Sequence, residues 1–209
     1  MRSAKVLVLL LLVIAGVAFL FLKGKPMEYR NFPPTATGEW IAYGDSLTSG
    51  VGAADGNDYP TLLAQQLGVK IHNFGVAGNT TADGLNRIDR ALALRPRVVL
   101  LCLGGNDGLR GLSAEKAFEN LGMMIDSFHE AGSFVVLIGI RSASFRDTNG
   151  KKFKELAAEK QVFYISDILD GVMGRPNLMS DYIHPNDAGY RAIADRVARE
   201  LRPVMDQLR

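Results

Sequence analysis

Two continuous apolar segments limit the folds available to this chain more than any other feature of the sequence. Val98 to Leu103 and Phe134 to Ile140 contain no charged side chain. Such runs are typical of strands that are buried on both faces of a sheet. Shorter strand-like segments are expected at Trp40 to Tyr43, Val69 to Phe74 and Val162 to Ile165. Strands of this kind need helices on both faces of the sheet.

The segments between these strands carry apolar residues at helical spacing. The helices predicted from this spacing are Tyr59 to Leu67, Thr81 to Leu94, a helix capped by Ser113 that runs to about Ala131, Lys151 to Lys160, and Asp187 to Leu208 with an interruption at Pro203. About five alternations of strand and helix predict an α/β fold with a parallel sheet between two helical layers.

The N-terminal part of the chain differs from the rest. Val6 to Leu22 is an uncharged apolar run with basic residues on both sides. It is at the short end of what spans a bilayer and longer than the usual apolar region of a cleaved signal peptide. We therefore expect residues 1–25 to form an N-terminal transmembrane helix, as a membrane anchor or uncleaved signal. Residues 26–39 are expected to be a polar linker, and residues 40–209 the functional domain.

A separate expectation concerns the side of the membrane on which the domain lies. Basic residues are nearly equal in number before and after the apolar run, so the positive-inside rule does not decide the orientation. Export signals with a short basic start usually leave the N-terminus in the cytoplasm. This predicts a domain outside the cytoplasm, in a periplasm where the cell has an outer membrane. Cleavage of the N-terminal segment would make the protein secreted.

Charge and cysteine content exclude several classes of partner and scaffold. The isoelectric point near 8.7 comes from the first 40 residues, because residues 41–209 hold 19 basic and 20 acidic side chains. No basic face is implied, and we expect no nucleic-acid partner. Cys102 is the one cysteine, so the fold has no internal disulfide. Its place in an apolar strand predicts a buried core residue.

Four polar blocks follow predicted strands or precede the last helix. They are Gly44-Asp45-Ser46, the segment from Gly75 to Thr80, Gly104-Gly105-Asn106-Asp107, and the segment from Asp181 to Pro185. In parallel sheets, ligands bind beyond the carboxyl ends of the strands. The four blocks are therefore expected to meet at one edge of the sheet.

The residue types in these blocks match the needs of acyl transfer. The Ser46 hydroxyl needs a base to become a nucleophile, and His184 is suited to that task. Asp181, three residues earlier, can fix the imidazole tautomer. A tetrahedral intermediate also needs hydrogen-bond donors for its oxyanion. The candidates are the Ser46 N–H, the Gly78 N–H and the Asn106 side-chain amide.

Each block also has a simpler interpretation when taken alone. Gly-Asp-Ser and the glycine-asparagine segments are common in turns and helix caps. Asp-x-x-His is also compatible with a capped turn or half of a metal site, but no further ligand cluster completes such a site. We therefore expect neither a metal nor another cofactor. His72 and His129 are interpreted as structural or exposed.

The four blocks together resemble a known family. GDSLTSG, GVAGNT, GGNDGL and DYIHPN are similar, in the same order, to the signature blocks of the SGNH (GDSL) hydrolases, especially their bacterial esterase, thioesterase and lysophospholipase branch. The resemblance runs from about Trp40 to the C-terminus. It implies a flavodoxin-like α/β/α sandwich and metal-free hydrolysis of carboxylic esters. It also implies Ser46, Asp181 and His184 as the triad, with Gly78 and Asn106 in the oxyanion hole.

One segment departs from that pattern. Residues 141–147, after the fourth predicted strand, are shorter than the tyrosine-containing segment of the relatives, which leaves the acyl-chain preference open. The leading hypothesis is a serine esterase acting on small acyl, aryl or lipid-type esters, or on thioesters. The alternatives are an acyltransferase that uses the same acyl-enzyme, and a non-catalytic, membrane-anchored domain that binds carbohydrate or lipid.

Overall fold

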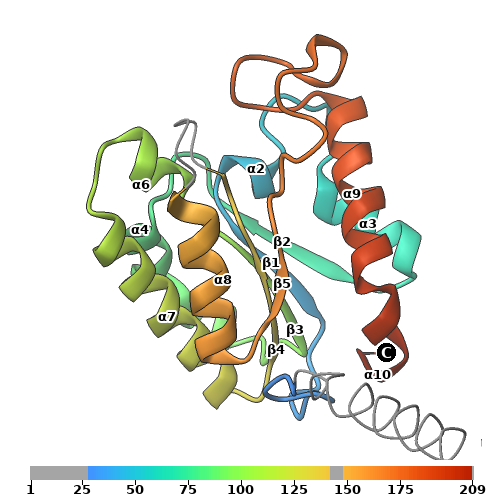
Figure 1. The fold of residues 1–209 in the computed structure, drawn as a ribbon. Coiled ribbons are helices and arrows are strands. Elements are labelled where there is room, and N and C mark those ends of the chain that lie inside the picture. The colour runs from blue at the N-terminus through green and yellow to red at the C-terminus, as the bar shows by residue number, and fades with distance from the viewer. Residues whose placement is uncertain (1–27, 142–147, 209) are drawn as a thin grey trace, which may run out of the picture.

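The computed structural model describes residues 28–141 and 148–208 and has three layers (Figure 1). The middle layer is a sheet of five strands in the order β2-β1-β3-β4-β5. The strands are β1 Trp40–Gly44, β2 Ile71–Gly75, β3 Val98–Cys102, β4 Phe134–Ile138 and β5 Phe163–Ile165, and every neighbouring pair is parallel. This is the flavodoxin-like strand order. The predicted parallel sheet of about five strands is confirmed.

Helices cover both faces of the sheet (Figure 1). One face carries α3 Tyr59–Leu67 and α9 Asp187–Leu201. The other face carries α4 Thr81–Asn86, α5 Ile88–Leu92, α7 Ala114–Glu130 and α8 Thr148–Lys160. The remaining helices are short: α2 Ser46–Ser49, α6 Gly105–Leu109, η1 Pro176–Leu178, η2 Arg202–Val204 and α10 Met205–Leu208.

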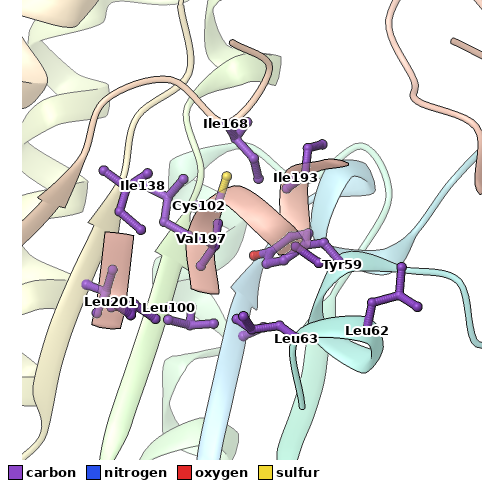
Figure 2. Packing of buried hydrophobic residues seen from close by; sticks show 14 of the residues in the cluster. Tyr59, Leu62, Leu63, Leu100, Cys102, Ile138, Ile168, Ile193, Val197 and Leu201 are labelled. Carbon is purple, nitrogen blue, oxygen red and sulfur yellow. The ribbon is translucent and has the colours of Figure 1, made fainter. Parts of the chain in front are cut away.

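The strands in the middle of the sheet contribute alternate side chains to two cores. Trp40, Leu100 and Val136 belong to the core under α3 and α9, part of which Figure 2 shows. Their neighbours Val99 and Leu101 belong to the core under α7 and α8. Every residue of β1, β3 and β4 is buried, which is why these strands read as continuous apolar runs.

One predicted helix is divided in two in the structure, whereas the closing helix is interrupted at the proline as predicted. The segment Thr81 to Leu94 was expected to be one helix, but it breaks at Arg87, whose φ of −114° and ψ of 11° are not helical. The Arg87 side chain turns toward the end of β1, where it donates a hydrogen bond to the Gly44 carbonyl. The closing helix is interrupted at Pro203, which has no N–H to donate: α9 ends at Leu201, a 3₁₀ turn covers Arg202–Val204, and α10 continues to Leu208.

The boundaries of two other elements also differ from the prediction. β2 begins at Ile71 and not at Val69, because the Val69 N–H still bonds to the Ala64 carbonyl of α3. β4 ends at Ile138, and the Gly139 N–H bonds to the Ile165 carbonyl at the end of β5. At β2, the hydrogen bond to the preceding helix moves the boundary that apolar content alone suggests.

The segment before β1 packs against the amino-terminal end of the sheet. The Tyr29 ring lies 5.9 Å from that of Phe134 and 5.4 Å from that of Phe163, measured between centroids. The Asn31 amide donates to the carbonyls of His129, at 2.8 Å, and Ser133, at 3.0 Å. The predicted membrane anchor at residues 1–25 lies outside the described residues. Within residues 28–141 and 148–208, no helix is long and apolar enough to cross a membrane.

Candidate active site

A sharp turn from β1 into α2 presents Ser46 at the carboxyl edge of the sheet. Asp45 caps α2 by accepting a hydrogen bond from the Leu47 N–H at 3.0 Å. Gly44 is required in this turn, because a Cβ there would lie 2.0 Å from Thr48 Oγ1 and 2.5 Å from the Cys102 carbonyl oxygen. The turn lies between β1 and β3, where the strand order reverses. Ligands of doubly wound sheets bind at such a switch point.

The structure brings Ser46, His184 and Asp181 together as a hydrogen-bonded chain. Ser46 Oγ lies 3.0 Å from His184 Nε2, and His184 Nδ1 lies 2.8 Å from Asp181 Oδ2. A carboxylate only accepts hydrogen bonds, so Nδ1 carries the proton that faces it. Nε2 is then the acceptor for the Ser46 hydroxyl proton. This is the geometry of a nucleophile, a base and a group that orients the base.

Asp181 is held as a carboxylate. Its Oδ1 accepts hydrogen bonds from the backbone N–H groups of Ile183 and His184, both at 2.7 Å. The hydrogen bond with the His184 ring, followed by these two backbone bonds, lowers the pKa of Asp181 to about 2. Asp181 is therefore ionised at every pH at which the imidazole can act as a base.

Hydrogen bonds from α9 join the two loops that carry Ser46 and His184. The Tyr190 hydroxyl donates to the Val51 carbonyl at 2.8 Å, and the Asp187 carboxylate accepts the Ala54 N–H at 2.8 Å. These contacts connect the chain after α2 to the first turns of α9. Local sequence patterns do not indicate these contacts, because each partner is more than 130 positions away along the chain.

Asn106 lies in the first turn of the short helix α6, which follows β3, and Gly78 lies in the turn after β2. The Asn106 amide donates to the Asn79 carbonyl at 2.9 Å and approaches Asp45 Oδ2 at 3.4 Å. Gly78 has a φ of +80°, and its carbonyl accepts a hydrogen bond from Arg110 at 2.7 Å. A hydrogen bond therefore joins the two segments that carry the predicted oxyanion donors. Among the described residues, Asn106 lines the pocket beside Ser46 and Gly78 does not.

Asp45 is a buried acid next to these groups, and the sequence pattern indicates it only as part of a turn or helix cap. It is 2% exposed. Loss of hydration raises the pKa of Asp45 to about 6, against the opposing effects of its backbone hydrogen bonds and of nearby His184. The cap it provides to α2 was the available signal in the sequence.

A cavity of about 370 Å³ opens beside Ser46. Its walls are mainly apolar and include Leu47, Leu109, Ile140, Leu169 and Met173. Its size and lining are typical of small-molecule sites. A second groove, of about 490 Å³, lies between α7 and α8, but it is lined mostly by charged and apolar side chains and lies away from Ser46.

The cysteine and the two other histidines of the sequence, all within the described residues, do not line the pocket beside Ser46. Cys102 is fully buried, and burial raises the pKa of its thiol well above the usual value. His72 pairs with Glu39 near the amino-terminal end of the sheet, and His129 is buried near the end of α7. In the part of the chain that the structure describes, no group of three or more His, Cys, Asp or Glu side chains could hold a metal ion.

Comparisons with known proteins agree with this fold. A family model described as the GDSL-like lipase/acylhydrolase family matches residues 42–192. An arylesterase of Vibrio mimicus is 32% identical over 178 residues, which cover 79% of this chain and 89% of the relative. Thioesterase 1/protease 1/lysophospholipase L1 of Escherichia coli K12 is 29% identical over 185 residues, covering 84% and 89%. The crystal structure of TesA has a TM-score of 0.74 at 28% identity and covers 79% of this chain and 98% of TesA.

These matches define first a class, an ester-bond hydrolase built on a parallel α/β sheet. The chain belongs to the GDSL-like lipase/acylhydrolase family, also called the SGNH hydrolases. The family resemblance stated from the four sequence blocks is confirmed.

Proposed function

We propose that this protein is a serine esterase that hydrolyses carboxylic esters through an acyl-enzyme on Ser46. The observation that carries the proposal is the pair of hydrogen bonds, 3.0 Å and 2.8 Å long, that joins Ser46 through His184 to Asp181. A serine hydroxyl is a weak nucleophile unless a base is within hydrogen-bond reach. His184 satisfies that distance without any rearrangement.

The proposed reaction has two half-reactions. Ser46 Oγ attacks the ester carbonyl carbon while His184 Nε2 takes the hydroxyl proton. The tetrahedral intermediate then collapses, and His184 returns the proton to the leaving alcohol or thiol. Water next attacks the acyl-enzyme while His184 takes a proton from it. The second tetrahedral intermediate collapses as His184 returns that proton to Ser46 Oγ, which releases the carboxylic acid and restores the free enzyme. Asp181 stabilises the imidazolium in both halves.

The proposed oxyanion hole consists of the Ser46 N–H, the Gly78 N–H and the Asn106 amide. Asn106 has one short hydrogen bond, to the Asn79 carbonyl, and one long one, to Asp45. The short bond fixes the side chain, while the proton on the long bond is available to a developing oxyanion. A glycine at position 78 lets the backbone come close to the substrate, and no charge is added by either donor.

The substrate class follows from the cavity. Its apolar walls suit the acyl or aryl part of an ester, and Leu109 and Met173 extend this surface to an exposed rim. The relatives named arylesterase and thioesterase 1/protease 1/lysophospholipase L1 support small acyl, aryl and lipid-type esters, as well as thioesters. Anchoring through residues 1–25, with the domain outside the cytoplasm, remains part of the proposal.

Replacement of the nucleophile tests this function. Ser46→Ala is expected to reduce kcat on p-nitrophenyl acetate and butyrate by at least about 10³-fold. It should also abolish labelling by a fluorophosphonate probe. Ser49→Ala is the matched control, because Ser49 lies one turn later in α2 and its hydroxyl bonds only to the Ser46 carbonyl among the described residues. Turnover by Ser46→Ala within tenfold of the Ser49→Ala rate would overturn the proposal.

A further inference from the structure

Arg87 lies where the predicted helix from Thr81 to Leu94 breaks into α4 and α5. Its guanidinium lies over the Tyr43 ring, 4.2 Å from the ring centroid, and is half-buried there. Nη2 donates to the Gly44 carbonyl at 2.9 Å, and Nε donates to Asn79 Oδ1 at 2.7 Å. One side chain therefore connects the end of β1 with the turn after β2.

Both partners of Arg87 lead directly to the proposed catalytic groups. Gly44 is the last residue of β1, two positions before Ser46. The carbonyl of Asn79 accepts the 2.9 Å hydrogen bond from the Asn106 amide, and Asn79 follows Gly78 in the chain. Arg87 thus reaches the nucleophile turn, the Gly78 turn and the Asn106 side chain through at most two hydrogen bonds.

The chemistry of the site is specific to arginine. Two N–H groups of the planar guanidinium donate to acceptors in different turns, and the same plane also lies over an aromatic ring. Partial burial lowers the pKa of Arg87, and the neighbouring Tyr43 opposes that effect. A lysine would carry the same charge, but its flexible ammonium cannot keep both distances and the ring contact at once.

We infer that Arg87 is a positioning residue for the oxyanion hole, and that it sets the separation between the Ser46 turn and the Gly78-Asn79 turn. The inference rests on the proposed function. Oxyanion donors act only within a narrow range of distances from the charge that forms. A shift of the Asn79 carbonyl moves Asn106 with it. Loss of Arg87 should therefore weaken the stabilisation of the transition state and leave the binding of substrate unchanged.

A merely structural role would have a different outcome. Breaking contacts around α4 would lower the thermal stability and leave the reaction of the folded enzyme intact. Tyr43→Phe models that case, because it removes the 2.6 Å hydrogen bond from the Tyr43 hydroxyl to the Gly84 carbonyl but keeps the ring under Arg87. Arg90→Lys, at an exposed arginine of α5, controls for the exchange of side-chain type.

The test compares Arg87→Lys with these two variants. We expect Arg87→Lys to lower kcat on p-nitrophenyl butyrate by about 10- to 100-fold, the range seen for small misplacements of catalytic donors. KM should change by less than about twofold, as expected for an interaction made in the transition state. A trifluoromethyl ketone forms an oxyanion-bearing adduct with a serine. Its inhibition constant should rise in proportion to the fall in kcat/KM.

A second variant covers the case in which lysine disturbs folding. In Arg87→Ala, added ethylguanidinium should restore part of the lost kcat and should leave the wild type unchanged. The inference is overturned if Arg87→Lys or Arg87→Ala keeps kcat within about twofold of Arg90→Lys. It is also overturned if activity is lost through KM with no change in the inhibition constant. Failure of the wild type to react with the ketone would instead reject the proposed function itself.

Discussion

His184 and His129 lie toward opposite ends of the sheet, in environments that differ in almost every respect. His184 is in an exposed loop at the carboxyl edge, and oxygen atoms lie 2.8 Å and 3.0 Å from its two ring nitrogens. His129 is buried near the end of α7. Within the described ranges, neither of its ring nitrogens has a hydrogen-bond partner.

The two environments differ in how they affect protonation of the imidazole ring. Burial lowers the pKa of His129 to about 4, and the nearby positive charge of Arg30 acts in the same direction. Lys160 adds a smaller effect of that sign, while Asp126 opposes it. His129 is thus neutral at physiological pH, and no described residue is placed to exchange a proton with it. A histidine becomes a base for catalysis only when a carboxylate orients it and a nucleophile is in reach.

Replacing each histidine by glutamine should give the largest difference in activity between the two ends of the sheet. We expect His184→Gln to lower kcat/KM on p-nitrophenyl esters by at least about 10³-fold, because Ser46 loses its base. His129→Gln should stay within about twofold of the wild type, since it has no part in the proposed reaction. Steady-state kinetics on both purified variants measures this. A comparable loss of kcat/KM in the two variants would contradict the different roles assigned to the two histidines.

The pH dependence of stability should report on His129. The unfolded chain binds a proton on this histidine below a pH of about 6.5, whereas the folded state resists the proton down to about 4. Stability conferred by the neutral ring is therefore present above pH 6.5 and is lost as the pH falls toward 4.

A non-titrating replacement removes that dependence. Between pH 8 and pH 5, the wild type should lose about 1–2 kcal/mol of unfolding free energy relative to His129→Leu. Urea unfolding at the two pH values measures the difference, and the Asp45 titration cancels because both proteins contain it. A gap between the two proteins that is the same at both pH values would contradict the assigned role of burial.

The smallest change in stability is expected for a substitution in the segment before β1, which packs beside His129 at the amino-terminal end of the sheet. Asn31 has a φ of 55°, so glycine keeps the backbone geometry while removing the two side-chain hydrogen bonds to the His129 and Ser133 carbonyls. Asn31→Gly should lower the free energy of unfolding by about 1 kcal/mol without changing kcat/KM. Asn31→Ala should cost more, because it adds strain at a positive φ. A fall in kcat/KM for Asn31→Gly would show that the two ends are coupled.

The sequence predicts the sheet and the neighbourhood of the site well, for a physical reason. Short continuous apolar runs such as Val98 to Leu103 are typical of strands buried inside a parallel sheet, and parallel strands bring their following turns to a common edge. The blocks around Ser46, Asn106 and His184 could thus be placed together without knowledge of any contact. The burial of His129 also had a signal, because it follows Ile125 by four positions on the apolar face of α7.

The supporting contacts could not be predicted in this way. Arg87 occupies a segment whose apolar stripe favours a single helix, and its partner Gly44 is 43 positions earlier. Tyr190 and Asp187 likewise find their partners only after the chain has folded. Local patterning carries information about elements and faces, whereas the hydrogen bonds that set distances between loops depend on the finished packing.

The packing of Tyr29 and Asn31 also bears on where a fusion partner or a solid support can be attached to the enzyme. These residues join the domain at the amino-terminal end of the sheet, and α10 ends toward the same end, away from the turn that carries Ser46 (Figure 1). A fusion partner or a solid support joined before residue 28 or after residue 208 is thus attached at the end away from the mouth of the cavity. Immobilised in either way, the enzyme would present its substrate opening to the bulk solution.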